Sequence, residues 1–84
     1  MRAIEAINLD DGYSSIIIFD NNQVIYVDGN KMLTPSGRRV SFHLTFSDNF
    51  KIRQAHPNDI AKIPDNIMTA FGWDERFGAI DQNI

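Results

Sequence analysis

The clearest alternation of apolar and polar residues in the chain runs from Arg39 to Phe46. Successive side chains of a strand point to opposite faces, so this alternation predicts a half-buried antiparallel strand with one face in the core. The core face would carry Val40, Phe42, Leu44 and Phe46. The solvent face would carry Arg39, Ser41, His43 and Thr45.

This strand is expected to begin a hairpin. Residues 47–49, Ser-Asp-Asn, are typical of a tight turn, after which residues 50–54 can return antiparallel. A loop of that length places Phe46 opposite Phe50, which keeps apolar residues together near the turn. The hairpin would then display one basic, solvent-facing surface made of Arg39, Ser41, His43, Thr45, Lys51 and Arg53.

Three further strands are predicted earlier in the chain, over residues 2–9, 13–19 and 23–27. Asp11-Gly12 favours a two-residue type I′ turn, which would set Ile7 opposite Ile16. Residues 20–22, Asp-Asn-Asn, predict the next turn because both residue types tolerate the left-handed conformation. Residues 31–34 are either another short strand or part of a flexible loop.

The second and third of these strands are apolar on both faces, at residues 16–19 and 24–27. Such strands are usually covered on both sides. A helix can supply one cover. The second must come from a curled sheet, from the C-terminal tail or from another molecule, so a homodimer through these strands is one expectation.

After His56 the apolar residues recur at helical spacings of three and four, at Ile60, Ile63, Ile67 and Phe71. This spacing predicts a short helical turn at 59–62 and a main helix from Pro64 to Phe71. Proline suits the first turn of a helix, and the glycine at position 72 suits its end. The tail, residues 73–84, is either the second cover of the sheet or a partly mobile end.

These elements predict an α+β fold. We expect a four- to five-stranded antiparallel meander, strongly curled where the apolar strands require it, with one short C-terminal helix packed on one face. At 84 residues the chain has room for one domain, 1–84, with a core of sheet and helix to about residue 72 followed by the tail.

Charge and composition narrow the class of protein. The chain has no cysteine, which excludes disulfides and thiolate sites. Its apolar runs are far shorter than a membrane span, and no secretory segment follows the first residues, so a soluble cytoplasmic protein is expected. The net charge is −3, yet residues 31–62 hold six basic and two acidic residues. This basic block is centred on the predicted hairpin.

No pattern in the chain indicates an enzyme, a cofactor or a metal. His43 and His56 would lie on opposite faces, and neither belongs to a metal-ligand motif. Ser41 has no histidine placed to act as its base. The aspartates at the predicted turns are explained by turn chemistry, since none forms a calcium loop and no phosphate-binding glycine motif is present.

Two functions remain as hypotheses. The leading one is a protein-binding module, an inhibitor or regulator of the kind that phages and mobile elements encode, which occupies the surface of a partner protein. Its interface would use the basic face or the aromatic residues of the tail, although Trp73 can equally be a lid on the core. The candidate partner-binding residues are Arg39, His43, Lys51, Arg53, Trp73 and Phe77.

The alternative is a nucleic-acid-binding module that holds phosphates with Arg39, Lys51 and Arg53. Sheets that bind single-stranded RNA usually display aromatic residues on the binding face. Here the aromatic residues of the hairpin would point into the core, and the chain as a whole is acidic. Both features favour a protein partner over a nucleic acid.

Overall fold

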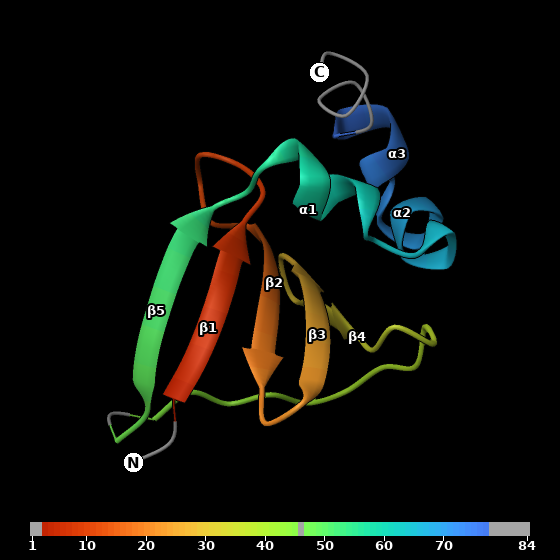
Figure 1. The fold of residues 1–84 in the computed structure, drawn as a ribbon. Helices are drawn as coiled ribbons and strands as arrows, with labels where there is room; N and C mark the ends of the chain where they lie inside the picture. Colours follow the sequence, from red (N-terminus) through yellow and green to blue (C-terminus); the bar gives the residue numbers. More distant parts are fainter. Residues whose placement is uncertain (1–2, 46, 78–84) are drawn as a thin grey trace.

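In the part of the chain that the structure describes, five strands form one mixed sheet, with three short helices at one end of one of its faces (Figure 1). The computed structural model describes residues 3–45 and 47–77. The strands are β1 (Ala3–Asn8), β2 (Ser15–Asp20), β3 (Gln23–Asp28), β4 (Lys31–Leu33) and β5 (Asn49–Gln54). The helices are α1 (Pro57–Ala61), α2 (Asp65–Phe71) and α3 (Trp73–Arg76). The strand order is β4-β3-β2-β1-β5, which confirms the α+β class.

The predicted hairpin at residues 39–54 is wrong. Between residues 39 and 45 the only strand-like pairing is an isolated bridge from Arg39 to Leu33. β5 instead lies beside β1 and runs parallel to it, with Ile4 opposite Phe50 and Ala6 opposite Ile52. The sheet is therefore an antiparallel meander of four strands with a parallel fifth strand, not a pure meander. Phe46 lies outside the described residues.

The segment from 34 to 45, here named the crossover, runs from the β4 edge of the sheet to the start of β5 (Figure 1). Its apolar residues Val40 and Phe42 pack against one face of the sheet. The alternation that predicts a strand thus serves to cover a sheet, because a chain lying flat on an apolar surface also needs every second side chain to be apolar. We name the covered face the crossover face; its buried residues are Ile4, Ala6, Ile18, Ile25 and Val27.

The opposite face, named the helix face, lies against the helices. Ile7, Leu9, Ile17 and Tyr26 form one buried cluster with residues of the helical segment, Ile60, Ile63, Ile67, Trp73 and Phe77. The expectation that β2 and β3 are covered on both sides is confirmed. The second cover is the crossover, which belongs to the same chain. On the helix face the cover is incomplete at Phe19 of β2, which is 38% exposed.

The pairing of β1 with β2 is shifted by one residue from the prediction, since Ile7 lies opposite Ile17 and not Ile16. The turn is a longer loop, closed by a 2.8 Å hydrogen bond from the Leu9 N–H to the Ser15 carbonyl. Within it the Asp10 carboxylate accepts hydrogen bonds from the N–H and the hydroxyl of Ser14. Because β2 is apolar on both faces, the sequence pattern does not select between the two registers.

The other local predictions agree more closely with the structure. Asn21 and Asn22 both have positive φ, 49° and 67°, and they join β2 to β3 in a two-residue turn. Residues 31–33 form a strand, β4. Gly72 ends α2 in the left-handed conformation, with φ 71°. α1 corresponds to the predicted helical turn at 59–62 and α2 to the predicted main helix, while α3 is an additional short helix. No helix in the described ranges is long and apolar enough to cross a membrane.

Trp73 and Phe77 lie in the core and not on a surface. The side chain of Trp73 is 0% exposed and that of Phe77 is 5% exposed. The Trp73 ring contacts Phe71 at a centroid distance of 4.8 Å, Phe77 at 5.9 Å and Tyr26 at 6.4 Å. Trp73 is thus the lid on the helix-face core, which was the other sequence interpretation. Residues 78–84 of the predicted tail lie outside the described residues.

Candidate functional site

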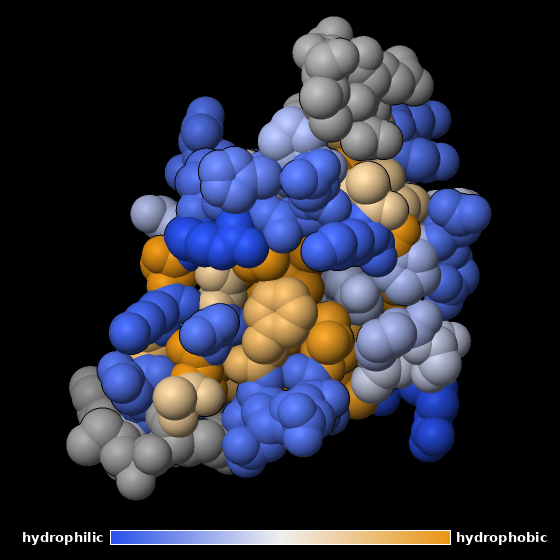
Figure 2. All heavy atoms as spheres, viewed as in Figure 1, coloured by the Kyte–Doolittle hydropathy of each residue, from blue (hydrophilic) through white to orange (hydrophobic). Residues whose placement is uncertain are grey.

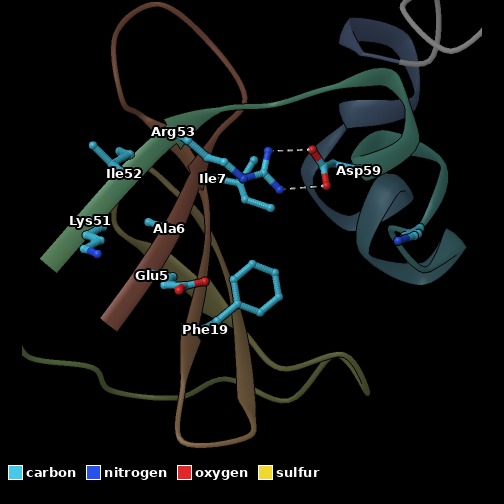
Figure 3. A pocket seen from close by; sticks show the side chains of 9 residues that line it. Glu5, Ala6, Ile7, Phe19, Lys51, Ile52, Arg53 and Asp59 are labelled. Atoms are coloured by element: carbon cyan, nitrogen blue, oxygen red, sulfur yellow. Dashed lines mark hydrogen bonds and ion pairs between the residues drawn. The ribbon is translucent and has the colours of Figure 1, made fainter. Parts of the chain in front are cut away.

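The helices cover only part of the helix face. Figure 1 shows them gathered at the end of the sheet where β1 and β5 finish, which leaves the other end of this face without a helix above it. In the same view, Figure 2 shows apolar residues near the middle of the face, surrounded by hydrophilic ones. A hollow of about 630 Å³ lies there; we name it the Phe19 groove (Figure 3). It is lined by Glu5, Ala6, Ile7, Phe19, Lys51, Ile52, Arg53, Asp59 and Lys62.

Phe19 forms the apolar centre of this groove. It lies on β2 opposite Glu5 of β1 and Val24 of β3, and its side chain is 38% exposed. Its ring also lines two smaller neighbouring hollows of about 120 and 300 Å³. The apolar surface of the helix face therefore continues beyond the helices and ends at an aromatic ring that solvent reaches.

One wall of the groove is fixed by an ion pair between Arg53 of β5 and Asp59 of α1. The two guanidinium nitrogens Nη1 and Nη2 donate to Oδ2 and Oδ1 of the carboxylate at 3.0 and 3.1 Å (Figure 3). The same carboxylate accepts the N–H of His56 at 2.9 Å, at the start of α1. The spacing of the two residues in the sequence does not indicate this pair. In the structure it joins the edge strand β5 to α1.

The ion pair changes the protonation of both groups. The hydrogen bonds from Arg53, together with the N–H of His56, hold the pKa of the Asp59 carboxyl below its ordinary 3.8, although burial acts in the opposite direction. The hydrogen bond to Asp59 raises the pKa of the Arg53 guanidinium. Both side chains are therefore fully charged near neutral pH, and Asp59 holds no proton that it could donate there.

The remaining charged side chains of the groove are Glu5, Lys51 and Lys62. Glu5 and Lys51 are neighbours across β1 and β5, on the same face. Within the described ranges neither Lys51 nor Lys62 forms an ion pair. Since Asp59 already neutralises Arg53, the two lysines outnumber Glu5, and the rim has a surplus of positive charge.

The structure divides the predicted basic face. Arg39 is bridged to Leu33 at the β4 edge, where it lines a separate hollow with Lys31 and Ser41. His43 lies on the crossover and is exposed. Lys51 and Arg53 lie on β5, at the opposite edge of the sheet, and both line the Phe19 groove. The four residues do not form one surface because the hairpin that would align them does not form.

The other charged or aromatic residues of the groove were not identified from the sequence, namely Glu5, Phe19, Asp59 and Lys62. One signal was present. Glu5 is a charged residue on the same face of β1 as Ile7, which indicates that this end of the helix face is open to solvent. The one-residue error in register concealed it, because only the observed register brings Glu5 opposite Phe19.

Among the described residues, no group of three His, Asp or Glu side chains is arranged to hold a metal ion. Comparisons of the chain with protein-family models, with curated proteins and with solved structures each found no match. The Phe19 groove is the basis for the functional inference that follows.

Proposed function

We propose that this protein is a small non-enzymatic protein-binding module that docks a partner protein on the Phe19 groove and acts as an inhibitor or regulator by occupying that partner's surface. The observation that carries the proposal is the position of Phe19. Its ring is partly exposed at the centre of a hollow of about 630 Å³ whose rim is charged.

The chemistry of the groove supports a protein partner. Protein interfaces combine aromatic anchors near the centre with a polar and charged rim, and the anchors contribute most of the binding energy. Covering Phe19 would remove apolar surface from water, at about 25 cal/mol per Å². The surplus of lysines on the rim favours a partner surface that presents acidic side chains around an apolar one.

The state of the groove's acids and bases supports the non-enzymatic part of the proposal. A general acid needs a proton near neutral pH, whereas the lowered pKa of Asp59 keeps that carboxylate charged. Its role is the ion pair with Arg53. The groove lining includes no serine, histidine or cysteine.

Nucleic-acid binding through Arg39, Lys51 and Arg53 has less support. Arg39 lies at the opposite edge of the sheet from the other two, and Arg53 is paired with Asp59. The aromatic ring of Phe19 could stack on a base, but a groove with a single aromatic ring and two acidic residues is a poor match to a polyanion.

Site-specific photo-cross-linking in the full chain tests the proposal. A benzophenone amino acid replaces Phe19 in one variant and Tyr13 in a matched control, since Tyr13 is the more exposed aromatic residue and lies outside the groove. We expect one specific partner protein to be cross-linked in cells, reproducibly, from position 19. We expect no cross-link to that protein from position 13. Equal labelling from both positions, or labelling from position 13 alone, would contradict the groove as the docking site.

A further inference from the structure

β5 is an edge strand whose outer side is open. Its neighbour in the sheet is β1, and all six of its residues are exposed (Figure 1). The Ala55 N–H donates to the Asn8 carbonyl of β1 at 2.9 Å. Because successive residues of a strand direct their peptide groups to alternate sides, the N–H and C=O groups of Phe50 and Ile52 point away from β1. In the described parts of the chain these groups have no backbone partner.

The two faces of β5 differ in chemistry. Lys51 and Arg53 lie on the helix face beside Glu5 and Ile7, at the Phe19 groove. Phe50 and Ile52 lie on the crossover face beside Ile4 and Ala6 and are 39% and 37% exposed. A strand added to this edge would therefore meet basic side chains on one face and apolar side chains on the other.

A second copy of β5 does not fit this edge. Antiparallel pairing of two β5 strands about a twofold axis places Lys51 opposite either Lys51 or Arg53 of the other copy in the central registers. Like charges directly opposite are destabilising. Parallel pairing turns one copy over, so that its basic side chains lie beside the apolar side chains of the other. Among the described residues Lys51 has no ion-pair partner, and Arg53, although paired with Asp59, is about half exposed. Charge complementarity therefore favours a segment with acidic side chains on this face.

We propose that β5 accepts an extended segment of a partner protein as an additional strand of the sheet, and that this segment alternates acidic and apolar residues. Its acidic side chains lie beside Lys51 and Arg53, and its apolar side chains lie beside Phe50 and Ile52. The backbone hydrogen bonds supply affinity and the alternation supplies specificity, as in other cases of strand addition. This inference rests on the proposed function, since it names the partner segment that lies next to the Phe19 groove.

The probe is a synthetic peptide of about eight residues that alternates Glu and Val, a length typical of strands. One control peptide has the same composition with all Glu residues first, and a second alternates Lys and Val. We expect the alternating Glu peptide to shift the amide NMR signals of Phe50 and Ile52 in the wild-type chain. We also expect it to bind at least about tenfold more tightly than either control, a difference that such titrations resolve.

Two variants at one position separate strand addition from side-chain contact. Ile52→Pro removes the outward N–H, and proline is tolerated at such a position on an edge strand. Ile52→Ala shortens the side chain and keeps the N–H. We expect the proline variant to weaken binding about tenfold or more and the alanine variant about threefold or less. Both variants should keep the amide spectrum of the sheet, which verifies the fold.

Three outcomes would overturn the inference: equal effects of the two variants, equal binding of the three peptides, or no shift at Phe50 and Ile52. Self-association of the chain through β5, detected as a concentration-dependent mass that Ile52→Pro abolishes, would also overturn it. The proposed function fails separately, if cross-linking at position 19 finds no specific partner. If a partner contacts position 19 without shifting the β5 signals, the proposed function is supported and strand addition at β5 is contradicted.

Discussion

Arg53 of the edge strand and Asp59 of the first helix are joined by two parallel hydrogen bonds, at 3.0 and 3.1 Å (Figure 3). The pair spans the chain reversal that carries β5 into α1, so it fixes the distance between the edge of the sheet and the helices. The Arg53 side chain is about half exposed, and an exposed pair of this kind contributes little to stability, about 1 kcal/mol at most. Its main effect is to hold one wall of the Phe19 groove in place.

The first prediction concerns this pair and pH. The folded-state pKa of Asp59 is lowered, so its contribution to stability is present above the unfolded pKa of about 3.9 and is lost as the pH falls through the folded value. Asp59→Asn should therefore lower the free energy of unfolding at pH 7 by about 1 kcal/mol or less. The difference from wild type should be smaller at about pH 3 than at pH 7, because the carboxyl then begins to be protonated in the unfolded state.

Urea denaturation of both proteins at the two pH values measures these differences. Asp11→Asn, in the exposed loop between β1 and β2, is the matched control and should show neither effect. If Asp59→Asn were as stable as wild type at pH 7, the ion pair would make no net contribution to the free energy of unfolding. A difference that persisted unchanged at the acid end would mean that the lost stability does not come from the carboxylate charge.

The second prediction concerns the core. Trp73→Ala should destabilise the fold by about 3 to 5 kcal/mol, because it removes the ring that Tyr26, Phe71 and Phe77 contact. Small domains have a total stability of only about 5 to 15 kcal/mol, so this variant should lose a large fraction of its stability and unfold at a clearly lower temperature than wild type. Thermal unfolding followed by circular dichroism measures the loss.

Trp73→Phe is the matched variant for this position. It keeps an aromatic ring and removes the indole Nε1, which is buried and has no hydrogen-bond partner among the described residues. Because no hydrogen bond is lost, Trp73→Phe should lower the free energy of unfolding only through poorer packing, and clearly less than Trp73→Ala does. Equal destabilisation by the two variants would show that the loss does not come from packing of the aromatic ring.

Local features of the fold were predictable from the sequence, whereas long-range pairing was not. The Asn21-Asn22 turn and the Gly72 helix end depend on backbone conformations that those residues favour, so they could be predicted. The register of β1 with β2 could not, since the side-chain pattern of β2 is satisfied on either face. The alternation around Phe42 fits both a paired strand and an extended segment that covers the sheet. Which of the two forms depends on whether β5 pairs with the crossover or with β1, and this long-range choice does not show in the alternation.

The candidate site shows the same division. Lys51 and Arg53 were identified as surface cations, and both line the groove. Phe19 was assigned to a strand apolar on both faces, and nothing in the sequence shows where the helices stop covering the sheet. The pairing of Arg53 with Asp59 depends on the chain reversal at His56, which sets a distance that residue spacing does not reveal.

The third prediction concerns Arg76 of α3. Its guanidinium lies 3.5 Å from the carboxylates of Asp10 and Asp28, and it stacks over the Phe77 ring at 4.9 Å. Each exposed contact is weak, but together they attach α3 to the loop between β1 and β2 and to the end of β3. Arg76→Ala should cost about 1 kcal/mol, and the cost should fall in about 1 M salt because screening shortens the range of charge interactions.

Arg76→Lys is the control for this site. Lysine keeps the charge but cannot reach two carboxylates with a planar fork, so we expect an intermediate loss of stability. Chemical denaturation at low and high salt separates the contributions. A loss that is independent of salt, and equal in both variants, would assign the effect to the contact with Phe77 and not to the two ion pairs.

The last prediction separates binding from folding in the Phe19 groove. Phe19→Thr removes the exposed ring but keeps a residue that suits a strand, and since part of the ring is buried we expect a loss of only about 1 to 2 kcal/mol. Lys51→Glu reverses a rim charge at an exposed position and places a second carboxylate opposite Glu5, so it should lower stability by about 1 kcal/mol or less. Both variants should weaken partner binding. Phe19→Thr should increase the dissociation rate, and Lys51→Glu should decrease the association rate in a way that depends on salt. Tyr13→Asn and Lys31→Glu remove an aromatic ring and a lysine charge outside the groove and serve as controls; asparagine tolerates the positive φ of 59° at position 13. Kinetics of association with the cross-linked partner measure all four variants, and equal rates for groove and control variants would place the interface elsewhere.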